Sequence, residues 1–130
     1  MSYLTQKTIK KPVSFSGIAL HNGLNVNVTL KSAKPNEGIV FKRVDLKNNN
    51  LVYPNFLNVT NTSLNTTIEN EHGVKVSTIE HLMGALFGLG IDNVIIEIDN
   101  EEVPILDGSA KVFIQKIILA GIKIVMLQSK

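Results

Sequence analysis

The stretch STIEHLMGALFGLGIDNVIIEID, residues 77–99, carries the clearest indication of how this chain folds. On a helical wheel five apolar side chains form one stripe, all within about 80° of the first: Ile79, Leu82, Met83, Leu86 and Leu89. Glycines at 88 and 90 end the helix predicted over 77–89, and the β-branched run 93–99 predicts a strand buried on both faces or nearly so. A helix that leads into a buried strand indicates packing on a sheet.

Strands are also predicted on the N-terminal side of this stretch. Apolar and polar residues alternate strictly over 24–31, a period typical of a strand with one buried face. A weaker strand pattern over 8–16 contains Pro12, which indicates an edge position or a bulge. Another short strand is expected over 38–43.

The asparagine-rich region 48–70 is expected to be mostly loop. At its end, the runs 66–69 and 74–76 flank a turn and suggest a hairpin in which His72 is only a turn residue. A second helix is predicted over 109–120, with Gly121 as its stop signal. Together these elements predict an α+β fold: a two-layer sandwich in which two helices cover one face of a mostly antiparallel sheet.

Composition restricts the classes of function. The 130 residues are 44% apolar and 18% charged, which is typical of one globular domain with a sizeable core. No cysteine is present, so any transition metal must be held by histidine and carboxylate. The net charge is +2 with a single arginine, Arg43, so no dense basic face for nucleic acid is expected.

The chain shows no targeting or membrane-spanning pattern. Its first residues lack the apolar core of a signal peptide, and Lys116 and Lys123 interrupt the most apolar segment, 112–127. No transmembrane segment is therefore expected, and the cytoplasm is the expected location.

Glu80 and His81, side by side at the predicted helix start, are the candidate chemical groups. Ser77 and Glu80 match a capping box, so Glu80 could be only a helix cap. His81 falls outside the apolar stripe, and it could equally be a surface or interface histidine. Its neighbours on the wheel are all small, which suggests that another surface docks there: Gly84, Ala85 and Gly88.

A catalytic zinc needs about three protein ligands and a base within reach of its water. His81 could hold the metal while Glu80 reaches the water, but no spacing ties further ligands to them. His21 and His72 lie in predicted turns. Three aspartates are also better explained as turn or cap residues: Asp92, Asp99 and Asp107.

Four blocks, in order, resemble a known family: GIALHNG at 17–23, STIEHLMGAL at 77–86, GLGIDN at 88–93 and ILDGSA at 105–110. They are similar to the N-terminal domain of UDP-3-O-acyl-N-acetylglucosamine deacetylase, the zinc hydrolase of lipid A synthesis in Gram-negative bacteria. The resemblance covers residues 6–122. It implies an enzyme of two similar domains with Zn²⁺ between them, which removes the N-acetyl group from a UDP-linked, acylated glucosamine.

The resemblance also implies roles for particular residues. Glu80 becomes the general base for the attacking water and His81 a zinc ligand. Leu64 and Asn65 are expected to line the substrate pocket. His21 matches a turn histidine of the family, for which a structural role is expected.

The remaining family ligands, a histidine and an aspartate in an H-K-x-x-x-D pattern, belong to the second domain and are not found in this sequence. We therefore expect residues 1–122 to be the deacetylase-like domain, 123–130 a truncated tail, and the second domain to be absent. The chain would then be one half of a two-domain enzyme, inactive alone and partnered by the missing domain. The alternative is a noncatalytic α+β remnant or interaction module.

Overall fold

The computed structural model describes residues 3–55, 59–61 and 65–128. Within these ranges the chain forms two helices and ten strands in three sheets. The helices are α1 (Glu80–Gly88) and α2 (Lys111–Ala120). The strands are β1 (Tyr3–Ile9), β2 (Val13–Ile18), β3 (Asn25–Ser32), β4 (Ile39–Arg43), β5 (Leu51–Val52), β6 (Val59–Asn61), β7 (Thr66–Glu69), β8 (Lys75–Ser77), β9 (Val94–Ile98) and β10 (Ile122–Gln128).

The central sheet has the strand order β2-β3-β9-β4-β5. Its pairs are antiparallel except β4 with β9, which run parallel, so the predicted sheet type is confirmed with one exception. The strands predicted over 24–31, 38–43 and 93–99 correspond to β3, β4 and β9. Strand β9 lies in the middle of the sheet, and Ile95 and Glu97 on its second face are half-buried.

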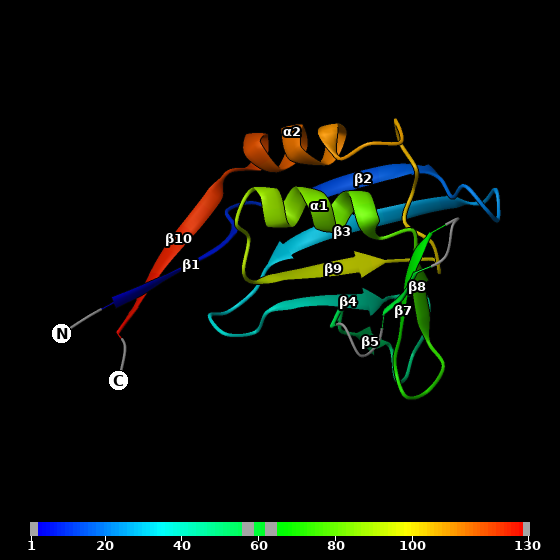
Figure 1. Ribbon diagram of the computed structural model, residues 1–130, viewed down its shortest axis with the longest axis horizontal. Coiled ribbons are helices and arrows are strands. Elements are labelled where there is room, and N and C mark those ends of the chain that lie inside the picture. The colour runs from blue at the N-terminus through cyan, green and yellow to red at the C-terminus, as the bar shows by residue number, and fades with distance from the viewer. Residues whose placement is uncertain (1–2, 56–58, 62–64, 129–130) are drawn as a thin grey trace.

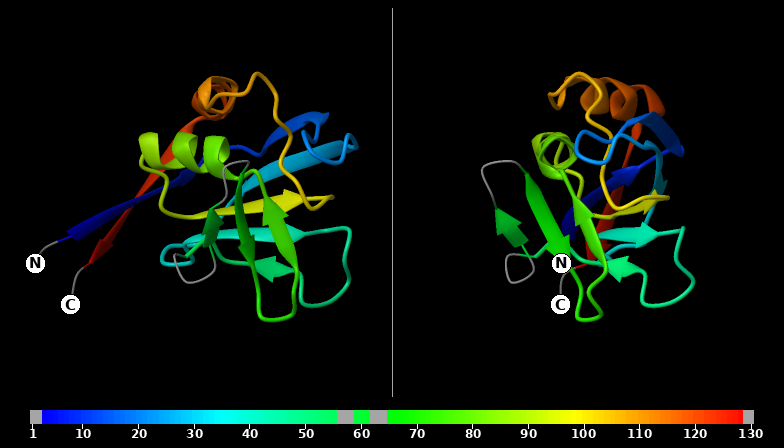
Figure 2. Two further views of the ribbon diagram at one scale, coloured as in Figure 1. Left: turned by 45° about the vertical axis from the view of Figure 1, so that its right-hand side comes forward. Right: turned by 90° about the vertical axis from the view of Figure 1, so that its right-hand side faces the viewer.

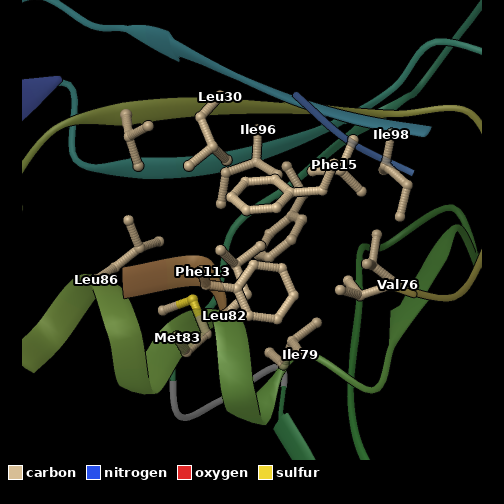
Figure 3. Close-up of a cluster of buried hydrophobic side chains, with 14 of the residues drawn as sticks. Phe15, Leu30, Val76, Ile79, Leu82, Met83, Leu86, Ile96, Ile98 and Phe113 are labelled. Atoms are coloured by element: carbon tan, nitrogen blue, oxygen red, sulfur yellow. The ribbon is translucent and has the colours of Figure 1, made fainter. Parts of the chain in front are cut away.

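Both helices lie on one face of this sheet (Figure 1 and Figure 2), so the predicted two-layer α+β architecture is confirmed. The core lies between the layers, and Figure 3 shows Leu82 and Leu86 of α1 facing the strands. Phe15 of β2 packs against Phe113 of α2, with ring centroids 4.8 Å apart. Of the helices in the described residues, neither is long and apolar enough to cross a membrane.

The single strand predicted over 8–16 is wrong. Residues 3–9 and 13–18 form separate strands in different sheets, and Pro12 lies in the break between them. Strand β1 pairs antiparallel with β10, and this ribbon extends away from the helices and the central sheet toward both chain ends (Figure 1). The residues that we expected to be a tail are thus a regular strand as far as Gln128.

The region predicted as loop between 48 and 70 contains two short strands, β5 and β6. Strands β7 and β8 form the predicted hairpin, and β6 pairs with β7 to complete a three-stranded sheet. The hairpin turn is closed by Asn70, whose side chain accepts a hydrogen bond from the backbone N–H of His72. His72 is therefore a turn residue, as predicted. The end of β8 leads directly to α1, where the candidate site begins.

Candidate functional site

The link between β8 and α1 is a sharp turn at Thr78. Thr78 is buried and adopts a φ of 58°, a conformation that β-branched residues rarely take. The helix N-cap is Ile79, and no side chain caps the helix. The predicted capping box is therefore wrong, because Ser77 belongs to β8 and Glu80 is already the first helical residue.

The turn is held by the segment around Glu102. The Ser77 N–H donates to the carbonyl of Glu101 over 2.8 Å, and the Val103 N–H donates to the carbonyl of Ser77 over 3.0 Å. The Thr78 hydroxyl donates to Glu102 Oε2 over 2.7 Å. These bonds connect the end of β8 and the turn to the segment 101–103. The start of α1 is therefore held by hydrogen bonds from both the backbone and a side chain.

Glu102 is also bound from its other side by the turn that contains His21. The His21 N–H donates to Glu102 Oε1 over 2.9 Å, and the His21 ring Nδ1 is hydrogen-bonded to Glu102 Oε2. His21 thus has a partner within the fold, in agreement with the structural role expected for it. Sequence reasoning missed Glu102 and Thr78, because no local pattern marks a contact between residues so far apart in the chain.

Glu80 has a buried carboxylate oxygen without a hydrogen-bond partner among the described residues. Its Oε1 atom is buried, and among the described residues no group donates a hydrogen bond to it. An unsatisfied buried polar atom costs roughly 1–3 kcal/mol, so a native structure that keeps one needs a reason for it. A bound group that this oxygen could contact would be such a reason.

His81 is half-buried at the next position of α1. Its ring has no hydrogen-bond or ion-pair partner within the parts of the chain that the structure describes. Gly84 and Gly88 beside it are exposed, and a Cβ at either position would meet nothing within 4 Å. The prediction that Ala85 also faces outward is wrong: it is 0% exposed, because α1 packs against α2 as well as the sheet.

A cavity of about 310 Å³ lies beside Glu80. It is lined by Pro54, Thr66, Ile79, Glu80, Met83, Gly84 and Phe87. Phe87, one of the lining residues, is 65% exposed, which is unusual for a large aromatic side chain. Sequence reasoning left Phe87 out, although the helical wheel places it at the margin of the apolar stripe.

The expected pocket residues on the strand side are only partly placed. Leu64 lies outside the described residues. Asn65 is half-buried, and its Oδ1 accepts a hydrogen bond from the Thr67 hydroxyl over 3.1 Å. Its neighbour Thr66 lines the cavity and accepts a weak hydrogen bond from the Ile79 N–H through its carbonyl, at 3.4 Å. The role of Leu64 and Asn65 in substrate binding stays a prediction.

The three aspartates are turn and loop residues, as predicted. Asp92 Oδ2 accepts from the Lys7 N–H and Asp99 binds Asn27, while Asp107 accepts from Ser109. Among the described residues no group of three or more His, Cys, Asp and Glu side chains could hold a metal ion. His81 with Glu80 is therefore at most part of a metal site. The Glu80 Oε1 atom and the His81 ring have no partner among the described residues, and a carboxylate and an imidazole are group types that suit a zinc-bound water and a zinc ligand.

The buried carboxylate of Glu102 should make the stability of the fold depend on pH. Glu102 is 2% exposed, and this burial acts to raise its pKa, but hydrogen bonds from Thr78, His21 and Asn22 together hold the pKa below its ordinary value. The ionised carboxylate therefore stabilises the fold above the unfolded-state pKa of about 4.3, and this contribution is lost as the pH falls toward the folded-state pKa.

We expect the free energy of unfolding, measured with urea, to fall more steeply below about pH 4.3 in the parent chain than in the Glu102→Gln variant. The variant has no carboxyl group to protonate at this position. Equal slopes for the two chains would contradict the assignment.

Comparison with known proteins adds a second line of observation. The family described as UDP-3-O-acyl N-acetylglycosamine deacetylase matches residues 6–130, which includes the residues expected to be a tail. Curated proteins called UDP-3-O-acyl-N-acetylglucosamine deacetylase are similar to this chain: 48% identical in Haemophilus influenzae (strain PittEE), 47% in Pasteurella multocida (strain Pm70) and 46% in Histophilus somni (strain 129Pt). Each comparison covers 92% of this chain and 39% of the relative, so the chain spans about two fifths of the length of these relatives.

Proposed function

Because the chain belongs to the UDP-3-O-acyl-N-acetylglucosamine deacetylase family, we propose that it is the N-terminal part of a zinc-dependent amide hydrolase. The reaction is removal of the N-acetyl group from UDP-3-O-acyl-N-acetylglucosamine in lipid A biosynthesis. The observation that carries this proposal is the buried Oε1 of Glu80, which has no partner among the described residues. The next residue in the chain is His81, whose ring also has no partner among them.

In this proposal His81 is one zinc ligand, and the other ligands come from a second domain of the family that is outside these residues. Zinc would supply polarisation of the amide carbonyl and a water that is more acidic than bulk water. Glu80 accepts the proton from the attacking water, since no group among the described residues donates a competing hydrogen bond to its Oε1. Leu64 and Asn65 contact the substrate, as the family resemblance implies.

The test compares this chain alone with a hybrid enzyme. The hybrid enzyme joins residues 1–130 to the part of the Haemophilus influenzae relative that follows its matched portion. We expect the hybrid enzyme to bind one zinc per chain and to deacetylate the substrate. The chain alone should bind zinc weakly and show little turnover, because the described residues offer no cluster of three ligands.

Two results would count against the proposal. Stoichiometric zinc binding at micromolar concentration with turnover by the chain alone would contradict the incomplete site. A folded hybrid enzyme that binds no zinc and has no activity would favour the noncatalytic module instead. Zinc content by mass spectrometry and substrate turnover measured on the same samples distinguish these results.

A further inference from the structure

We infer that Thr78 and Glu102 are positioning residues that fix the direction in which α1 presents Glu80 and His81. The inference rests on the proposed function, since it concerns the placement of that pair. It starts from the geometry of the turn between β8 and α1, which is defined by contacts from two other parts of the chain.

The backbone of Thr78 is in the left-handed region, with φ at 58°. A β-branched residue crowds its own backbone there, so the chain by itself favours a negative φ. Such conformations persist only where the surrounding structure holds them, and they gather at functional sites. Contacts from other parts of the chain must therefore hold Thr78 at this positive φ, and one of them is the hydrogen bond that its hydroxyl makes.

Glu102 holds it through the hydrogen bond from the Thr78 hydroxyl, 2.7 Å long and buried. The carboxylate is itself fixed, because both His21 and Asn22 donate backbone N–H groups to its Oε1, at 2.9 and 3.4 Å. The His21 ring adds a third contact. Oε1 thus accepts from the turn at residues 21–22, and Oε2 is bonded to both that turn and Thr78, so Glu102 cannot rotate without breaking several bonds.

Thr78 is close in the chain to the candidate pair, Glu80 and His81. Thr78 is two residues before Glu80, and Glu80 begins the helix without a side-chain cap to fix its first turn. A change of φ at Thr78 would rotate the start of α1 and withdraw the Glu80 oxygen from its buried position. The strained turn therefore replaces the missing cap as the element that sets the direction of the helix.

The test uses a matched pair of variants of the 130-residue chain, Thr78→Ser and Thr78→Val. Serine keeps the hydroxyl and removes the branch, whereas valine keeps the branch and removes the donor. A strong intraresidue NOE between the amide proton and Hα marks a positive φ. We expect the Thr78→Ser variant to keep this NOE at residue 78 and the parent amide shifts of Glu80 and His81.

The Thr78→Val variant should lose the NOE and shift both amides, while the amides of β3 and β9 stay at their parent positions. Glu102→Gln, which keeps the shape of the side chain but replaces one acceptor oxygen by a donor, should give the same changes if Thr78→Val does not fold. The inference would be overturned if the folded Thr78→Val variant gave parent-like signals for residues 78–81. If Thr78→Val does not fold, parent-like signals for these residues in Glu102→Gln would overturn it.

The hybrid enzyme gives a separate functional readout. At saturating zinc, Thr78→Val should lower kcat about 10–100-fold, as expected for loss of a group that orients a catalytic residue, with KM unchanged. Thr78→Ser should restore kcat to within about twofold of the parent. A Thr78→Val enzyme with the parent kcat would overturn the inference. If the parent hybrid enzyme is inactive, the proposed function fails, whereas the NMR result still decides whether Thr78 and Glu102 position α1.

Discussion

Replacing Glu80 by glutamine is expected to lower kcat of the hybrid enzyme by about 10²–10⁴-fold, the range for loss of a general base. Glutamine has nearly the same shape but cannot accept the proton from water. Zinc content and KM should stay close to the parent values, because the side chain is not assigned to metal or substrate binding. Steady-state kinetics and metal analysis of the purified variant measure these quantities.

The same variant separates a catalytic role from a structural one. If Glu80 only accepted hydrogen bonds within the fold, Glu80→Gln would destabilise the chain by about 1–3 kcal/mol. No side chain caps α1, and the buried Oε1 has no partner among the described residues, so Glu80→Gln should not reduce the free energy of unfolding. Glu71, an exposed carboxylate in the hairpin turn, provides the control: Glu71→Gln should change neither kcat nor stability. A full-rate Glu80→Gln enzyme would contradict the assignment of the base.

The second large effect is expected for His81→Ala, which removes the ligand that this chain contributes. Loss of a group that merely orients a ligand reduces metal affinity by about 10–100-fold, so loss of the ligand itself should reduce zinc affinity of the hybrid enzyme by more than about 100-fold. Turnover should fall with metal occupancy and recover in part at high zinc concentration. Zinc titration with a competing chelator measures the affinity.

The chain offers a matched control for this experiment. His72 is an exposed histidine in the β7–β8 turn, where its N–H is bound by Asn70. His72→Ala should leave zinc affinity and turnover at the parent values. Equal losses for His72→Ala and His81→Ala would indicate a general effect of removing histidines, and unchanged affinity in His81→Ala would place the metal elsewhere.

The sequence predicts most of the fold because its signals are local. The alternation over 24–31 and the apolar stripe of α1 each reflect one buried face, and both elements occur with boundaries shifted by at most three residues. The order of helices and strands then leaves few ways to bury those faces. The prediction of Ala85 failed because a single wheel does not show that a second helix covers the flank of α1.

The turn between β8 and α1 could not be predicted from local sequence patterns. Ser77 and Glu80 have the spacing of a capping box, but the backbone of Ser77 is already paired with the segment 101–103. That pairing extends β8 to Ser77 and delays the helix start to Glu80. The strand β10 was missed for a related reason, because its partner β1 is more than a hundred residues away in the chain.

For the candidate site, the sequence indicated Glu80 and His81 but not what holds them. Their adjacency is visible in the sequence, and the outward position of His81 follows from the helical period. Thr78 and Glu102 carry no such pattern, since their roles depend on a backbone angle and on one long-range hydrogen bond.

The most direct measurement is the position of zinc in crystals of the hybrid enzyme, located by anomalous scattering at the zinc absorption edge. We expect one strong peak at about 2.0–2.1 Å from a ring nitrogen of His81, the usual zinc–histidine distance. The Glu80 carboxylate should point toward the metal site without binding the ion directly. A peak bound to His21 or His72, or a zinc site that does not include His81, would contradict the account.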